Sequence, residues 1–255
     1  MVYIGMDIGS TAAKTAVLNE DKTEVLYKEA VPTGWDSRQT AQSIREMLEH
    51  KGYPVEQAVC TATGYGRVSV DFADRVITEI TCHAKGASFL HGGDATVIDI
   101  GGQDTKIISM QNGMVTDFIM NDKCSAGTGR FLEIMASSLG VGLEEMFSLA
   151  REGEEVKISS MCTVFAESEV ISLIGKGTPK ADIACGVIAS IVNKVVSQTA
   201  KHRNAGTSYF LTGGFSVSDY MTEALAEKLK AEVTTHPDAR FAGAIGAALL
   251  GKKKG

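Results

Sequence analysis

Two stretches of the chain carry residue types whose spacing suits binding of an anion. The first runs from Asp7 to Lys14 and the second from Asp99 to Lys106. Each follows an apolar run and reads Asp-Ile-Gly, four small or polar residues and Lys, before a second apolar run. This order predicts strand, tight turn and strand. Because glycine at such a turn lets backbone N–H groups approach a phosphate, the sequence predicts the same phosphate-binding hairpin twice.

The aspartate that leads each hairpin is a candidate for holding magnesium. A carboxylate at the end of a buried strand suits Mg²⁺, since this ion keeps several waters and takes few direct carboxylates. The alternative is that Asp7 and Asp99 only cap their turns. One glycine-rich turn alone would be weak evidence, because most such turns are structural. Two copies in matching register strengthen the functional interpretation.

The five cysteines offer a second kind of chemistry. We expect Cys60 and Cys185 to be small core residues. Cys82, at the start of a predicted helix beside His83, is expected to be part of a neutral pair, buried or exposed, with metal binding as the alternative. Cys124 and Cys162 each stand where a loop enters a predicted helix, and a helix N-terminus favours the thiolate form. A [4Fe–4S] cluster normally takes four thiolates, so two cysteines are half a site that a two-fold dimer would complete. The alternative is a pair of buried cysteines with no ligand.

Composition narrows the function classes. The 255 residues include 25 basic and 31 acidic side chains and 6% aromatics, which argues against a nucleic-acid groove. No apolar run approaches the roughly 18 residues that span a bilayer, and the N-terminus lacks a signal-peptide pattern. We therefore expect a cytoplasmic chain without a membrane partner. An odd number of cysteines without a secretion signal argues against a disulfide framework.

The hairpins are expected within an alternation of strands and helices. The elements predicted for the first half are strands at 24–31 and 57–61 and helices at 36–50 and 79–90, the earlier helix capped by Asp36 or Ser37. The elements predicted for the second half are a strand at 114–120 after the turn Asn112-Gly113, helices at 129–139, 143–151, 162–173, 179–203 and 218–230, a strand at 208–211 and a small-residue helix at 243–248. Thr178 is expected to cap the helix at 179–203. The loop at 91–94 gives predicted domains at 1–94 and 95–255.

Two phosphate hairpins and a late Gly213-Gly214 together resemble the sugar kinase, heat-shock ATPase and actin superfamily. The resemblance covers nearly the whole chain. It implies an α/β chain with the two-lobed actin-like ATPase fold, in which ribonuclease H-like domains are duplicated. It also implies a nucleotide cleft between the lobes, with ATP and Mg²⁺ held by the loops at Gly9 and Gly101 and the adenosine against Gly213-Gly214.

A closer resemblance involves the segments 121–129 and 160–170, which look like the signature of the component-A type activator ATPases of 2-hydroxyacyl-CoA dehydratases. These proteins are related to the ATPase subunits of benzoyl-CoA reductase, within the BadF/BadG/BcrA/BcrD-like ATPase family. The segments 63–67, 79–86 and 97–106 match the same family.

That family implies an ATPase coupled to electron transfer in anaerobic metabolism. Its members are homodimers with one bridging [4Fe–4S] cluster, for which Cys124 and Cys162 of each subunit would be the ligands. An electron from ferredoxin or flavodoxin passes, with ATP hydrolysis, to an iron–sulfur dehydratase. The family often has Gln where Arg240 stands, so the adenine contacts are expected to differ in detail. It often has Ala where Ser125 stands, which leaves the assignment of the cluster ligands unchanged.

For hydrolysis we assign Asp7 and Asp99 to Mg²⁺ and its waters and Gln103 to orienting the attacking water, with Asp104 as a competing candidate. Positioning and charge stabilisation dominate phosphoryl transfer, so a glutamine can suffice. The residues expected to bind ATP or ADP are Gly9, Ser10, Thr11, Ala12, Ala13, Lys14, Gly101, Gly102, Gln103, Asp104, Gly127, Thr128, Gly129, Glu133, Gly213, Gly214, Phe215 and Arg240.

Other functions are compatible with the same motifs. A sugar or acetamido-sugar kinase would share the fold and both loops, and Asp104 could be its base. A non-enzymatic actin-like assembly protein or nucleotide switch would also share them. Within the redox interpretation, the electron acceptor could instead be a benzoyl-CoA-reductase-type or double-cluster protein. Sugar-dependent ATP consumption or filament formation would separate these rivals from an electron-transfer protein.

Overall fold

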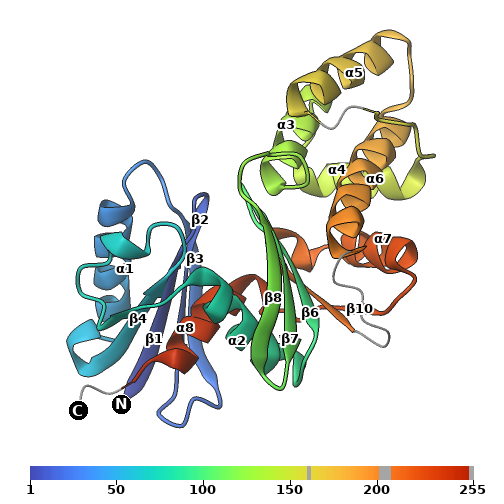
Figure 1. Cartoon of the computed structure of the whole chain (residues 1–255). Helices are drawn as coiled ribbons and strands as arrows, with labels where there is room; N and C mark the ends of the chain where they lie inside the picture. The colour runs from blue at the N-terminus through green and yellow to red at the C-terminus, as the bar shows by residue number, and fades with distance from the viewer. Residues whose placement is uncertain (160–161, 201–207, 253–255) are drawn as a thin grey trace. The chain divides into compact units, whose positions relative to one another are not determined.

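The chain folds into two five-stranded sheets of the same strand order (Figure 1). The structure is a computed structural model that describes residues 1–159, 162–200 and 208–252. The first sheet has the order β3-β2-β1-β4-β5, and its strands are β1 (Val2–Ile8), β2 (Ala12–Leu18), β3 (Val25–Pro32), β4 (Ala58–Thr63) and β5 (Arg75–Val76). The second has the order β10-β9-β6-β7-β8, and its strands are β6 (Thr96–Ile100), β7 (Thr105–Gln111), β8 (Met114–Asn121), β9 (Tyr209–Gly213) and β10 (Val233–Thr234). Taken from β8, the second order repeats the first strand for strand, as expected for a duplicated domain.

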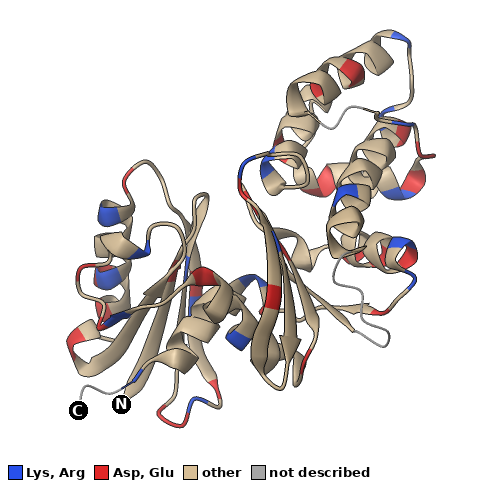
Figure 2. Cartoon of the chain, viewed as in Figure 1, with Lys and Arg blue, Asp and Glu red and all other residues tan. Residues whose placement is uncertain are grey.

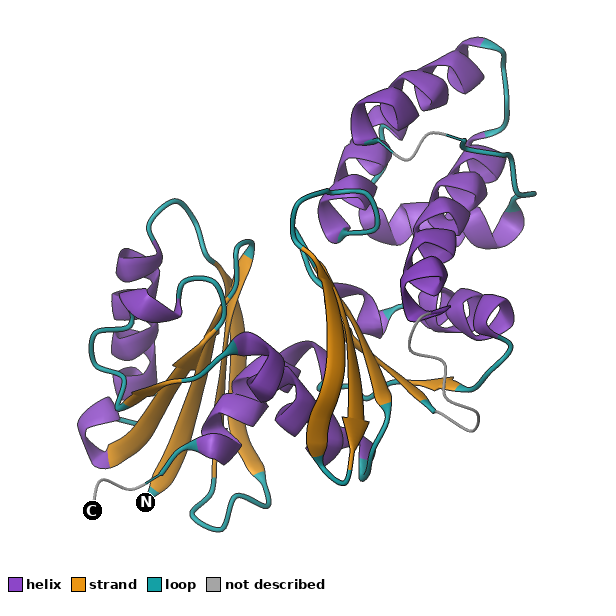
Figure 3. Cartoon of the chain, in the orientation of Figure 1, coloured by secondary structure: helices purple, strands orange, loops and turns teal. Residues whose placement is uncertain are grey.

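Helices accompany both sheets (Figure 3). The α-helices are α1 (Ser37–His50), α2 (Glu79–His91), α3 (Gly129–Leu139), α4 (Leu143–Glu152), α5 (Thr163–Gly175), α6 (Lys180–Thr199), α7 (Asp219–Leu229) and α8 (Ala242–Leu250). Short 3₁₀ turns are η1 (Val55–Gln57), η2 (Arg67–Ser69), η4 (Gly214–Val217) and η5 (Ala239–Phe241). The predicted helices and strands are confirmed with ends shifted by a few residues, and the two-residue strands β5 and β10 were not predicted.

The alternation of side chains along β1 divides its residues between the two faces of the first sheet. Ile4, Met6 and Ile8 are fully buried in one core cluster with residues of α1. Asp36 caps α1, because its carboxylate accepts hydrogen bonds from the backbone N–H groups of Arg38 and Gln39. The residues between the apolar ones, Asp7 included, therefore point to the opposite face.

Helix α8 packs on that opposite face and against α2. A Cβ on Gly86 of α2 would overlap the Ala242 carbonyl, and one on Gly246 of α8 would overlap the Cys82 carbonyl. A Cβ on Gly5 of β1 would overlap the Ala244 carbonyl of α8. The prediction that small residues at 243–248 permit tight helix packing is confirmed.

The second core is built around α6, whose apolar stripe is buried as predicted. Pro179 occupies the N-cap position, so the prediction that Thr178 caps this helix was wrong. Residues 201–203, which were predicted to be helical, lie outside the described residues. Among the helices that the structure describes, α6 is the one long and apolar enough by composition to cross a membrane. Core helices pass the same test, and α6 is a core helix here.

The chain divides into two units, each with its own core. The first comprises Met1–Val97, Ile108–Phe118 and His236–Gly255, and the second comprises Ile98–Ile107 and Ile119–Thr235. The C-terminal helix α8 thus belongs with the first sheet, whereas the predicted domains at 1–94 and 95–255 placed it in the second lobe. Within each unit, acidic and basic residues are interspersed (Figure 2).

Candidate functional site

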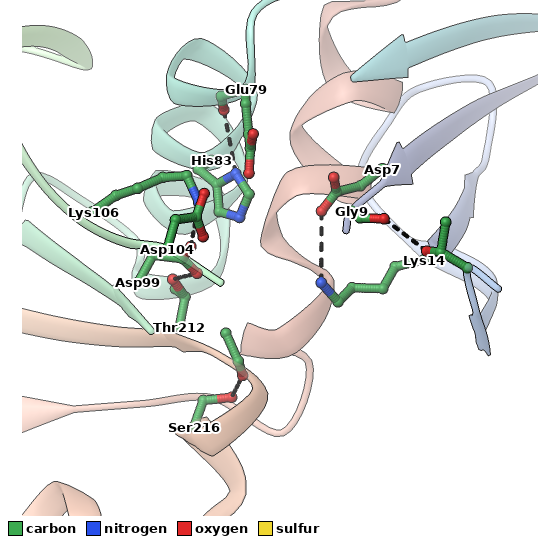
Figure 4. Close-up of polar contacts among 12 residues, drawn as sticks. Asp7, Gly9, Lys14, Glu79, His83, Asp99, Asp104, Lys106, Thr212 and Ser216 are labelled. Atoms are coloured by element: carbon green, nitrogen blue, oxygen red, sulfur yellow. Dashed lines mark hydrogen bonds and ion pairs between the residues drawn. The ribbon is translucent and has the colours of Figure 1, made fainter. Parts of the chain in front are cut away.

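The first hairpin places Asp7 at the end of β1, opposite Lys14 of β2. The Asp7 side chain is 2% exposed, and its Oδ2 lies 3.8 Å from the Lys14 ammonium nitrogen (Figure 4). Its Oδ1 is buried and has no hydrogen-bond partner among the described residues. A buried carboxylate oxygen without a donor is costly unless a ligand or ion supplies one. The described part of the chain therefore provides no donor for this oxygen.

Two glycines pack closely against that carboxylate. Gly64 has φ +87°, and a Cβ there would overlap Asp7 Oδ1. A Cβ on Gly243 would lie 2.5 Å from Asp7 Oδ2 and 2.7 Å from His83 Cε1. His83 is buried, and its Nδ1 lies 3.2 Å from the Glu79 carbonyl oxygen. Any side chain at either glycine would therefore overlap the Asp7 carboxylate.

The turn of the first hairpin is held by backbone hydrogen bonds. Gly9 N–H donates to the Ala12 carbonyl over 3.2 Å. The Thr33 hydroxyl donates to the Gly9 carbonyl over 2.7 Å, and Thr33 N–H donates to the Thr11 carbonyl over 3.0 Å. Of the six residues predicted to contact phosphate, Ser10 and Thr11 are exposed, whereas Ala12 and Ala13 already belong to β2.

The second hairpin places Asp99 at the end of β6, where both of its carboxylate oxygens have partners. The Lys106 ammonium lies 3.1 Å from Asp99 Oδ2, and the Thr212 hydroxyl donates to Asp99 Oδ1 over 2.8 Å. Lys106 also lies 2.8 Å from Asp104 Oδ2 and is 1% exposed (Figure 4). The two copies of one sequence pattern therefore differ in how their carboxylates are satisfied.

The start of α3 is tied to the turn of the second hairpin. Gly129 N–H donates to the Gly101 carbonyl over 2.9 Å, and Arg130 N–H donates to the Gly102 carbonyl over 2.7 Å. Gln103 is exposed at the tip of this turn, as a residue that orients water would need to be. Glu133 lies on the first turns of α3 in an ion pair with Arg130 at 3.1 Å.

The predicted adenosine motif follows β9. Gly213 has φ +87°, and a Cβ there would lie 3.0 Å from Asp99 Oδ1, whereas a Cβ on Gly214 would meet nothing within 4 Å. The ring of Phe215 is buried and packs edge-on against Phe147 with 5.7 Å between ring centroids. The ring of Phe215 is therefore packed inside the second unit.

Arg240, also predicted to bind ATP, belongs to the first unit. Its Nε is buried without a hydrogen-bond partner in the described part of the chain. Its guanidinium carbon lies 5.5 Å from the centroid of the Phe241 ring.

The cysteines fall into two groups by exposure. Cys124 and Cys162 are exposed, so the alternative of two buried cysteines was wrong. Burial raises the pKa of the thiols of Cys60 and Cys82 to about 12. Cys162 is the N-cap residue of α5, as the thiolate argument requires. Cys124 instead lies in the loop before α3, which begins only at Gly129, so the helix-start argument does not extend to it.

A hydrogen bond connects the surroundings of the two exposed cysteines. The hydroxyls of Ser125 and Thr163, the residues that follow Cys124 and Cys162, lie 2.7 Å apart. The Asn121 side-chain amide donates to the Cys124 carbonyl over 2.8 Å. Within the described parts of one chain, no group of three or more His, Cys, Asp or Glu side chains is arranged to hold a metal ion. Two thiols on one chain suit a cluster only if another chain supplies further ligands.

Comparison with known proteins identifies the family of this chain. The model of the BadF/BadG/BcrA/BcrD ATPase family matches residues 4–251. The chain belongs to this ATPase family. The (R)-2-hydroxyglutaryl-CoA dehydratase activating ATPase of Acidaminococcus fermentans is 45% identical, over 98% of this chain and 97% of that protein. The crystal structure of that dehydratase's component A matches with a TM-score of 0.92 and 43% identity, covering 98% of this chain and 97% of the other.

A second member of the BadF/BadG/BcrA/BcrD ATPase family has been solved with a nucleotide. This is the activator of the 2-hydroxyisocaproyl-CoA dehydratase from Clostridium difficile with bound ADPNP, with a TM-score of 0.91, 35% identity, and coverage of 98% of this chain and 94% of that one. A ROK family glucokinase from Streptomyces griseus matches with a TM-score of 0.64 at 16% identity over 98% of this chain and 99% of its own, which shows the fold alone. The predicted actin-like ATPase fold and the predicted family are confirmed.

Several residues that shape the site were not predicted. Thr33 and Thr212 donate to the two hairpins from elsewhere in the chain, and Gly64 and Gly243 pack against the Asp7 carboxylate. Thr212 and Gly64 stand within motifs that are recognisable in the sequence. Nothing local to Thr33 or Gly243 distinguishes them from ordinary turn and helix-packing residues.

Proposed function

We propose that a homodimer of this chain, with one bridging [4Fe–4S] cluster, accepts an electron from ferredoxin or flavodoxin. Driven by ATP hydrolysis, it passes that electron to an iron–sulfur 2-hydroxyacyl-CoA dehydratase. Relatives that match nearly end to end are named as dehydratase activators, which supports the acceptor. The observation that carries the proposal is a set of hydrogen bonds that leads from the second phosphate hairpin to Ser125 and Thr163, the residues that follow the two exposed cysteines.

That set begins at the turn of the second hairpin, where Gly101 accepts from Gly129 at the start of α3. The Thr105 hydroxyl on β7 donates to the Gly127 carbonyl over 2.5 Å. The loop between these contacts is closed by the Thr128 hydroxyl, which donates to the Ser125 carbonyl over 2.7 Å. A displacement of the hairpin would therefore be passed to the loop that contains the first cysteine.

The last bond in the set crosses to the helix of the second cysteine. The Ser125 hydroxyl bonds the Thr163 hydroxyl, and Thr163 is the first residue of α5 after Cys162. Hydrogen-bonded elements with two discrete arrangements are the physical means by which distant sites couple. Nucleotide-dependent movement of the hairpin would in this way change the surroundings of both thiols together.

The residues present fit the groups that the family implies. The two exposed thiols supply soft ligands, and the N-terminus of α5 stabilises negative charge at Cys162. A cluster bound there would supply a one-electron centre whose potential depends on hydrogen bonding and exposure. At the first hairpin, Asp7 has a carboxylate oxygen without a donor in the described residues, and a carboxylate at this position suits a hydrated Mg²⁺.

A second copy of the chain is required because one chain offers two thiols. Val164 and Phe165, which follow Thr163 on α5, are each 66% exposed. Apolar side chains of this size in water next to Cys162 support a subunit contact around the cluster. Closed two-fold symmetry is the commonest arrangement that would bring four thiols together.

Anaerobic purification with iron and sulfide analysis tests the proposal. Wild type is expected to be a brown, oxygen-sensitive dimer with about four irons per two chains. Cys124→Ser and Cys162→Ser are expected to lose the cluster, and the matched control Cys185→Ser, at a half-buried thiol, is expected to retain it. Retention of a full cluster in both single variants would refute the ligand assignment.

The activity measurement separates the proposal from a kinase. Wild type with ATP and a low-potential reductant is expected to reduce an iron–sulfur dehydratase, and hydrolysis without the reductant is expected to transfer nothing. A colourless protein that consumes ATP only when a sugar is added would instead support the sugar kinase alternative.

A further inference from the structure

We propose that Asn121 is a positioning residue for the thiol of Cys124. Its side-chain amide holds the loop after β8 so that successive backbone N–H groups face the sulfur and stabilise negative charge there. The inference rests on the cluster part of the proposed function. It concerns the cysteine that no helix start serves, since Cys162 is the N-cap residue of α5, whereas Cys124 lies in the loop before α3 begins at Gly129.

The amide of Asn121 makes two hydrogen bonds across this loop. Asn121 is the last residue of β8, and its Nδ2 donates to the Cys124 carbonyl over 2.8 Å and to the Ala126 carbonyl over 3.1 Å. A side-chain NH₂ group has two hydrogens, so both bonds form at the same time. The amide therefore fixes the peptide group that follows Cys124 and the peptide group that follows Ala126.

Two threonines hold the other carbonyls of the loop. Thr128 donates to the Ser125 carbonyl through its hydroxyl over 2.7 Å and through its N–H over 3.0 Å. The Thr105 hydroxyl donates to the Gly127 carbonyl. With the two bonds from the β8 amide, every carbonyl from residue 124 to residue 127 accepts a hydrogen bond from a side chain of the second unit.

Peptide geometry then sets the direction of the N–H groups in this loop. In a trans peptide the C=O and the N–H of one planar unit point in opposite directions. The N–H groups of Ser125, Ala126 and Gly127 therefore point away from the side chains of Asn121 and Thr128. Successive N–H groups directed to one side form a concavity that attracts anions, an arrangement that recurs at phosphate and iron–sulfur sites.

The side to which these N–H groups point is the side of the Cys124 sulfur. The threonine donors Thr128 and Thr105 are 0% and 1% exposed, so the opposite side of the loop faces solvent, and Cys124 is exposed. Hydrogen bonds to the sulfurs tune the potential of an iron–sulfur cluster, and they raise it because an added electron increases the negative charge. Without the Asn121 amide, the two carbonyls that it holds would be free to turn and the N–H groups would turn with them.

The experiment compares two variants that lack the amide donor with a control on the same strand. Asn121→Leu keeps a similar side-chain size, and Asn121→Asp keeps the shape but has an ionised carboxylate that cannot donate. The control is Thr116→Val, because the Thr116 hydroxyl donates to the Ser109 carbonyl over 3.3 Å, away from the cysteine loop. Each protein is purified anaerobically, and three quantities are measured: the reduction potential by titration followed by electron paramagnetic resonance, the rate of iron release to a chelator, and the melting temperature.

Asn121→Leu is expected to release iron about 10- to 100-fold faster than wild type, as second-shell substitutions at metal sites typically do. Its reduction potential is expected to be more negative than that of wild type, because the reduced cluster loses N–H hydrogen bonds. Its melting temperature is expected to fall by about 2–8 °C through the loss of two hydrogen bonds. Asn121→Asp is expected to change in the same directions, with a further lowering of the potential by its negative charge. Thr116→Val is expected to keep the wild-type potential and rate of iron release.

A wild-type potential in Asn121→Leu would overturn the proposal even if the melting temperature falls, because Asn121 would then only stabilise the loop. Shifts of equal size in Thr116→Val would overturn it as well. If Asn121→Leu is folded but isolated without iron, the rate of iron release from Asn121→Asp decides, and a wild-type rate there would refute the positioning role.

The outcomes for this inference and for the proposed function are distinguishable. If wild type binds no cluster, the proposed function and this inference fall together. If wild type binds a cluster and Asn121→Leu matches it in potential and iron release, this inference alone is refuted. A wild type that holds a cluster but does not reduce a dehydratase refutes the proposed acceptor and leaves these measurements unchanged.

Discussion

Gly246→Ala tests the packing of α8 against α2. Helix α8 also contains Gly243, which packs against the Asp7 carboxylate. Gly246 lies on α8 where it crosses α2, and an added methyl carbon would lie 2.6 Å from the Cys82 carbonyl carbon and 2.8 Å from the Gly86 nitrogen. These are backbone atoms inside a helix, so they cannot rotate away as a side chain would. The helix also cannot simply retreat, because a Cβ on Gly5 would overlap the Ala244 carbonyl on its other side.

The magnitude follows from two opposing terms. Forcing a methyl group into a well-packed contact costs about 1–3 kcal/mol and more where backbone must move. Alanine has a higher helix propensity than glycine by about 1 kcal/mol, which offsets part of that cost. A net loss of about 2 kcal/mol corresponds to a melting temperature lower by about 4–8 °C in a chain of this size.

The assay is thermal unfolding of the nucleotide-free protein followed by circular dichroism at 222 nm, a wavelength that reports helix content. The matched control is Gly175→Ala at the end of α5, where an added Cβ would meet nothing within 4 Å. This control is expected to melt at or slightly above the wild-type temperature, since only the propensity gain applies. Equal melting temperatures for Gly246→Ala and wild type, or equal losses in both variants, would refute the packing argument.

Four further predictions concern the Asp7 carboxylate, the cap of α1 and the cysteine thiols. Gly243→Ala should weaken ADP binding with Mg²⁺ by about 10-fold or more, because its methyl group displaces the Asp7 carboxylate; calorimetry checks this. Asp36→Ala should lower the free energy of unfolding by about 1 kcal/mol through loss of the α1 cap, measured by urea titration. Iodoacetamide at pH 8 should modify the exposed thiols but not Cys60 or Cys82, as judged by mass spectrometry of the native protein. Because burial raises the pKa of those two thiols from 9.0 to about 12, the unfolded chain loses their protons first and stability should fall as pH rises from about 9 to 12.

Local sequence signals predicted the parts of the fold that depend on near neighbours. The turn Asn112-Gly113 was expected from its two residues alone, and both adopt positive φ, at 53° and 71°. The helix at 129–139 begins and ends where the apolar spacing predicted. The prediction of the α6 cap was wrong because Thr178 and Pro179 are both plausible residues for the start of a helix. The Thr178 N–H donates to the Leu173 carbonyl of α5, so the position of the cap depends on the loop that follows α5.

The chemical difference between the hairpins could not be predicted, because it is set by residues far away in the chain. Thr212, which satisfies Asp99, lies 113 positions further on, and Gly243 approaches Asp7 from the last helix. The sequence pattern around the two aspartates is the same, so any argument from that pattern assigns them the same role. The two loops share one sequence pattern, but contacts with distant residues in each unit give their carboxylates different partners. The motif therefore predicts the strand and the turn, whereas residues far away in the chain decide how each carboxylate is satisfied.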